Sequence, residues 1–73
     1  MRIEEVIELM NTSLLKQEQA KEAMDILDYE IDSAETIVAD IETEIHSRRE
    51  FQAKLRVYTN LKNRLKNEFK AQK

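Results

Sequence analysis

Apolar residues recur along the chain with a seven-residue repeat, which is typical of helices that pack side by side. With Ile3 at position a, the a positions are Ile3, Met10, Gln17, Met24, Ile31, Val38 and Ile45, and the d positions are Val6, Ser13, Ala20, Leu27, Ala34 and Ile41. Every a and d position from Ala20 to Ile45 is apolar, which indicates coiled-coil-like packing of this segment. Polar residues interrupt the repeat before it, and residues 11–13 (Asn-Thr-Ser) favour caps and turns, so we expect a break there.

The repeat changes register after Ile45. The next apolar positions are Phe51, Leu55, Tyr58, Leu65 and Phe69, which are shifted by four residues. Ser47 is followed three residues later by Glu50, which matches the capping box found at helix starts. Two interpretations fit this boundary: a tight corner at about residues 45–48, or one continuous helix whose coiled coil contains a four-residue stutter. We favour the corner.

These patterns predict an all-α protein with a single domain, residues 1–73, built as a helical hairpin. The long helix is expected at about 13–46, the second helix at about 48–71, and a short N-terminal helix at 2–10. The composition agrees, because the chain contains no glycine and no proline and is rich in strong helix formers. The sequence leaves open whether the helices pair within one chain or between chains.

The size of the chain points to self-association. A domain of 73 residues buries a small core, and small domains commonly need a disulfide, a structural metal or a partner subunit. With no cysteine, disulfides and thiolate zinc sites are excluded. We therefore predict a homodimeric bundle.

Charge is distributed unequally along the chain. Residues 1–45 carry thirteen acids and three bases, whereas residues 46–73 carry two acids and nine bases. An antiparallel pairing of the second helix with the first brings opposite charges together, and a parallel self-pairing opposes like charges. Because each exposed ion pair contributes only about 0.2–1 kcal/mol, we expect these charges to select orientation more than to supply stability.

The unequal helix lengths suggest an interface. A helix over 48–71 covers only the later half of the first helix, so no other part of this hairpin packs on the N-terminal apolar residues. Either the N-terminal turns fold back as a short helix, or a second copy covers them. We predict that the N-terminal apolar stripe forms the partner or dimer interface through Ile3, Val6, Ile7, Met10 and Leu14.

The basic second helix offers an alternative function. Its positive residues alternate with aromatic ones, as in surfaces that bind nucleic acid. The candidate RNA or DNA contacts are Arg48, Arg49, Arg56, Lys62 and Arg64. Against this reading, the aromatic residues have the spacing of a packing seam, and the acidic segment competes for the same bases.

Candidate catalytic and metal-binding residues are sparse. His46 has Glu42 and Glu50 four residues away on either side, and Asp25, Asp28 and Asp32 recur at helical spacing. A hairpin offers little of the concave, desolvated pocket that catalysis needs, so we expect no enzyme activity, cofactor, metal or small-molecule substrate.

No apolar run reaches membrane-spanning length, and the acidic N-terminus is unlike a signal peptide. We therefore expect a cytoplasmic protein without membrane partners. We predict that it acts as a small adaptor, assembly factor or inhibitor that binds proteins through an amphipathic helix face.

Overall fold

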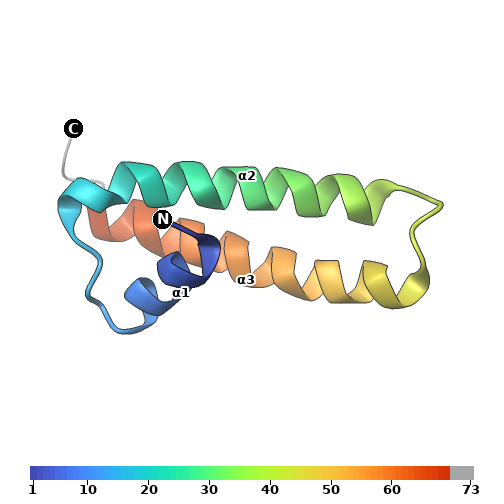
Figure 1. The fold of residues 1–73 in the computed structure, drawn as a ribbon, viewed down its shortest axis with the longest axis horizontal. Helices are drawn as coiled ribbons and strands as arrows, with labels where there is room; N and C mark the ends of the chain where they lie inside the picture. The colour runs from blue at the N-terminus through green and yellow to red at the C-terminus, as the bar shows by residue number, and fades with distance from the viewer. Residues whose placement is uncertain (70–73) are drawn as a thin grey trace.

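The protein forms three α-helices and one short 3₁₀ turn, and the computed structural model describes residues 1–69. The elements are α1 (Ile3–Asn11), η1 (Gln17–Gln19), α2 (Ala20–Ala39) and α3 (Ile45–Phe69). Helices α2 and α3 run antiparallel as a hairpin, and α1 lies across one side of it near the end of the hairpin opposite the corner (Figure 1). The all-helical hairpin predicted from the sequence is confirmed, as is a separate short N-terminal helix.

The turn that follows helix α1 contains a serine with a left-handed backbone. Ser13 has a φ of 59°, a region that glycine usually occupies. The Leu14 N–H donates to the Leu9 carbonyl over 2.9 Å, and the Ser13 N–H donates to the Met10 carbonyl over 3.3 Å. These two bonds form a Schellman motif, which satisfies carbonyls that the helix end leaves free. The break expected at residues 11–13 therefore lies where the polar residues indicated it.

The long helix predicted over 13–46 is shorter than expected at both ends. Residues 14–16 have no helical structure, and α2 begins only at Ala20, after η1. The Lys16 N–H donates to the side-chain oxygen of Gln19 over 3.0 Å, which fixes the start of this turn. At the other end α2 stops at Ala39, because Asp40 takes an extended conformation.

The predicted corner between α2 and α3 is present, but its predicted position at about residues 45–48 is wrong. The connection spans residues 40–44, and the first helical bond of α3 runs from the Arg48 N–H to the Glu44 carbonyl over 2.9 Å. Ser47 therefore lies inside α3 and does not cap it, and the continuous helix with a stutter is excluded. The predicted end of the second helix at residue 71 lies outside the described residues.

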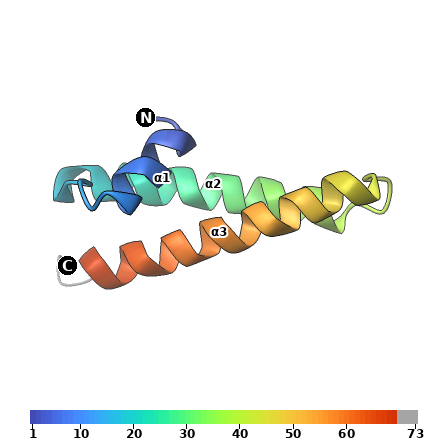
Figure 2. The ribbon, with the colours of Figure 1, turned by 90° about the horizontal axis from the view of Figure 1, so that it is seen from below.

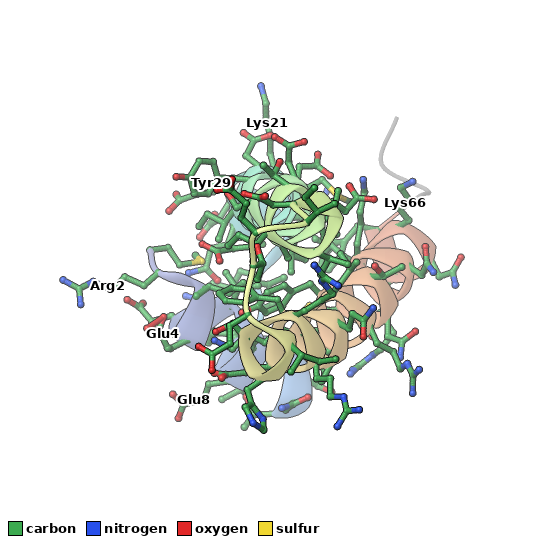
Figure 3. The ribbon with its side chains drawn as sticks, turned by 90° about the vertical axis from the view of Figure 1, so that its right-hand side faces the viewer. Arg2, Glu4, Glu8, Lys21, Tyr29 and Lys66 are labelled. Carbon is green, nitrogen blue, oxygen red and sulfur yellow. The ribbon has the colours of Figure 1, made fainter. Side chains whose placement is uncertain are left out.

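Helices α1, α2 and α3 surround one apolar core at the end of the hairpin away from the corner. Seen along the hairpin from its corner end, they occupy the corners of a triangle (Figure 3). The fully buried large side chains are Val6, Met10, Leu27 and Leu65, with Tyr58 and Leu61 beside them. Ala34 is the only buried residue towards the corner among residues 1–69. The core is therefore deep where α1 is present and thin where it is absent.

Candidate functional site

The connection between α2 and α3 is a short loop held by several hydrogen bonds. The Asp40 carboxylate accepts from the Glu42 N–H over 2.9 Å, and the Thr43 hydroxyl donates to the Ile37 carbonyl over 2.8 Å. From α3, the Arg48 guanidinium donates to the Asp40 carbonyl over 2.9 Å. These bonds hold a loop that contains neither the glycine nor the proline that tight corners usually contain.

The loop and the first residue of α3 expose two large apolar side chains at the end of the molecule. Ile41 is 90% exposed and Ile45 is 57% exposed. The carboxylates of Asp40, Glu42 and Glu44 lie between and beside them and are also exposed. We refer to residues 40–45 as the hairpin tip. It combines two exposed isoleucines with three exposed acidic residues, and it lies at the end of the hairpin farthest from α1 (Figure 2).

The N-terminal apolar stripe is mostly buried within the chain. The expectation that the rest of the same chain cannot cover it is therefore wrong. Val6 and Met10 are 0% and 1% exposed, and Ile3 and Ile7 are half-buried against the same core. The reason is that α1 folds back onto the hairpin, which was one of the two outcomes considered. Leu14, in the loop after α1, remains 66% exposed.

The five basic residues proposed as nucleic-acid contacts divide into two groups. Three are engaged inside the chain: Arg48 holds the corner, Arg64 donates to the Met10 carbonyl over 3.1 Å, and Lys62 pairs with Asp28 of α2. Arg49 and Arg56 are exposed, seven residues apart on α3, and have no ion pair within the described part of the chain. The structure thus does not bring the five together as one free basic surface.

The Lys62–Asp28 pair joins the basic helix to the acidic one, as the charge pattern predicted for an antiparallel pairing. It is the one ion pair between α2 and α3 found in residues 1–69. The other pairs on α3 are local, from Lys54 to Glu50 over 3.6 Å and from Arg64 to Glu68 over 3.7 Å. The antiparallel hairpin therefore depends on its apolar seam more than on ion pairs.

A second surface feature is an open groove between the start of α1 and α2. Its walls include Ile3, Ile26 and Tyr29 together with the carboxylates of Glu4 and Glu30. Within residues 1–69, no set of three or more histidine or acidic side chains is placed to hold a metal ion. His46 lies exposed in the first turn of α3.

Tyr58 lies in the core close to this groove. Burial raises the pKa of its phenol above the ordinary value of 10.0, and the nearby Glu30 carboxylate raises it further. The phenol therefore keeps its proton to a higher pH than an exposed tyrosine does.

No protein-family model matches the chain, and searches of curated proteins and of solved structures likewise gave no significant match. No helix in residues 1–69 is both long enough and apolar enough to cross a membrane.

The hairpin tip was not singled out from the sequence. Ile41 and Ile45 occupy d and a positions of the heptad, so the repeat assigned them to the seam. The signal in the sequence was the set of acidic residues beside them, Asp40, Glu42 and Glu44. Acidic side chains are rarely buried, so their density argues against a buried seam at this point.

Proposed function

We propose that this protein is a non-enzymatic interaction module that binds another protein through the hairpin tip. The observation that carries the proposal is the 90% exposure of Ile41 on a loop whose backbone is fixed by hydrogen bonds. Burying such a side chain in a partner's pocket contributes about 1.5–3 kcal/mol. Because the loop is already ordered, little conformational entropy is lost on binding.

The chemistry of the tip defines the partner it suits. The two isoleucines require an apolar pocket, and the surrounding carboxylates favour lysine or arginine at the rim of that pocket. The acids also oppose contact between two tips, since like charges would face each other. The tip is therefore suited to a different protein, with the chain acting as adaptor, assembly factor or inhibitor.

Site-specific photo-cross-linking in the source cells tests this proposal. A benzophenone amino acid at position 41 should give a discrete cross-linked product. The same group at Lys21, which is exposed near the start of α2 at the end of the hairpin opposite the tip, is the matched control and should not. Adding Glu42→Lys and Glu44→Lys should weaken the product from position 41, because the charge of the tip is reversed. Equal cross-linking from positions 41 and 21 would contradict the proposal.

Nucleic-acid binding is a second candidate, favoured by the exposure of Arg49 and Arg56 on one side of α3. Such binding should fall steeply with salt concentration, and replacing both arginines with glutamate should abolish it. Arg48 is unsuitable for this test because its guanidinium holds the corner. Failure to bind a mixed-sequence RNA or duplex DNA at low salt would remove this candidate.

A further inference from the structure

The open groove between α1 and α2 combines apolar walls with an exposed aromatic ring. Ile3 of α1 and Ile26 of α2 are half-buried in its walls, and Tyr29, which also lines it, is 70% exposed. The groove has a volume of about 600 Å³, which is within the usual range of binding sites. An exposed tyrosine beside apolar walls offers a flat surface on which a ligand can stack. We call this surface the α1–α2 groove.

Negative charge predominates in the α1–α2 groove. The carboxylates that line it are those of Glu4, Glu22, Asp25 and Glu30. Glu22 pairs with the amino group of Met1 over 3.1 Å, whereas the other three take part in no ion pair among residues 1–69. Arg2 is the one basic side chain among the lining residues, and it projects away from the molecule (Figure 3). Within the described part of the chain, three carboxylates of the groove are therefore left without a cationic partner.

Two of these carboxylates come together from different helices. Burial raises the pKa of Tyr58 most, and the carboxylates of Glu30 on α2 and Glu4 on α1 raise it further, so both lie near the same phenol. Glu30 is half-buried, which leaves its charge less screened by salt than that of an exposed acid. Two like charges held close together repel, and a cation bound between them replaces this repulsion with attraction. The groove therefore suits a cationic ligand that also has apolar surface.

We propose that the α1–α2 groove binds an arginine side chain presented by another protein. The guanidinium group is flat, so it can stack on the Tyr29 ring while its N–H groups donate to the carboxylates of Glu4 and Glu30. The aliphatic part of the same side chain would pack against Ile3 and Ile26. A lysine ammonium neither stacks in this way nor forms paired bonds to a carboxylate, so arginine uses more of the groove.

The α1–α2 groove is separate from the hairpin tip. It lies where α1 packs, towards the end of the hairpin opposite residues 40–45 (Figure 2). The inference therefore goes beyond the proposed function and does not depend on it. Glu42→Lys should weaken binding through the tip and leave arginine binding in the groove unchanged, because salt screens charges over about 10 Å. Failure of one proposal is thus distinguishable from failure of the other.

Titration of the purified full chain with a short peptide, followed through its amide NMR signals, tests the proposal. The probe is acetyl-Gly-Arg-Gly-amide, and the control peptide carries citrulline, which resembles arginine in shape but has no charge. The arginine peptide should shift the signals of Ile3, Ile26 and Tyr29. The citrulline peptide should bind about 2- to 30-fold more weakly, because at least two ion pairs of about 0.2–1 kcal/mol each are lost.

Variants of the groove test which side chains hold the peptide. Tyr29→Ala should weaken binding about 2- to 5-fold, because the stacked ring is lost. Glu30→Gln should weaken it about 1.4- to 5-fold, because one ion pair is lost. Glu35→Gln is the matched control for Glu30→Gln, since it removes the same charge from an exposed position of α2 outside the groove, and it should leave the Kd unchanged. Circular dichroism verifies that each variant is folded.

Four results would overturn the proposal. The first is the absence of shifts with the arginine peptide at millimolar concentration and low salt. The second is equal binding of the arginine and citrulline peptides, and the third is an effect of Glu35→Gln as large as that of Glu30→Gln. The fourth is movement of the groove signals when the protein alone is diluted tenfold, which would show that a second copy fills the groove.

Discussion

Replacing Met10 with alanine tests whether α1 is part of the core. Met10 is 1% exposed and packs with Val6, Leu27 and Leu65. Truncating a buried methionine to alanine costs about 2–5 kcal/mol, because apolar contacts are lost and a cavity remains. A domain of this size has a total stability of about 4–11 kcal/mol, at roughly 0.05–0.15 kcal/mol per residue. The variant should therefore lose a large fraction of its stability.

Leu14→Ala is the matched control, because Leu14 lies four residues later in the same apolar stripe but is 66% exposed. This substitution should change stability by less than about 0.5 kcal/mol. Urea unfolding followed by circular dichroism measures both values. With a slope of about 1 kcal/mol/M, the midpoint of Met10→Ala should fall by about 2 M or more.

The comparison also distinguishes intrachain burial from burial by a second copy. If α1 folds onto its own hairpin, the cost of Met10→Ala should be the same at two protein concentrations that differ tenfold. A cost for Met10→Ala no larger than that for Leu14→Ala would refute the reasoning, as would a cost that disappears on dilution.

Three further perturbations test the corner, the core tyrosine and the ion pair. Arg48→Lys should lower the free energy of unfolding by about 1–2 kcal/mol in urea titration, because lysine cannot reproduce the guanidinium bonds to the loop, whereas Arg49→Lys should have no measurable effect. In a Tyr29→Phe background, ultraviolet titration of Tyr58 should give a pKa above 10.0. The free energy of unfolding should fall as pH rises past 10, because the folded state holds this proton more tightly than the unfolded state does. Lys62→Met should cost less than about 1 kcal/mol at low salt and less again at 1 M salt, as judged by thermal unfolding in both buffers.

The left-handed backbone at Ser13 provides another test. Glycine occupies this region without the steric penalty of a side chain, so Ser13→Gly should stabilise the protein by about 0.5–1 kcal/mol. Thr12→Gly, one residue earlier in a right-handed conformation, should not stabilise it. Equal effects of the two substitutions on the thermal midpoint would show that Ser13 carries no strain.

The helices were predictable from the sequence to the extent that periodicity defines them. The heptad identified two of the three buried residues of α2, Leu27 and Ala34, but it missed Ala23, which is also fully buried. The α3 seam was likewise found through Tyr58 and Leu65, although Leu61, which is 5% exposed, was missed. Burial repeats along a helix and is therefore visible in a single sequence.

The ends of the helices were less predictable, because they depend on contacts between residues that are not periodic. The capping box at Ser47 was wrong since the corner is closed instead by Arg48 reaching back eight residues to the Asp40 carbonyl. Similarly, the docking of α1 depends on Arg64 and on burial of Met10, which are far apart in sequence. Neither contact has a local sequence signature, so the acidic residues beside Ile41 and Ile45 were the only sign of the site at residues 40–45 that the sequence contained.

The hydrogen bond from Arg64 to the Met10 carbonyl joins residues 54 positions apart, whereas the α2–α3 hairpin closes through a loop of residues 40–44. Closing the longer segment costs more chain entropy, so the hairpin should form first during folding and α1 should dock last. On the reverse path α1 should detach first, and its amide hydrogens should exchange with solvent sooner than those of Leu27 or Leu65. Local opening at α1 should therefore require less free energy than opening of the α2–α3 hairpin.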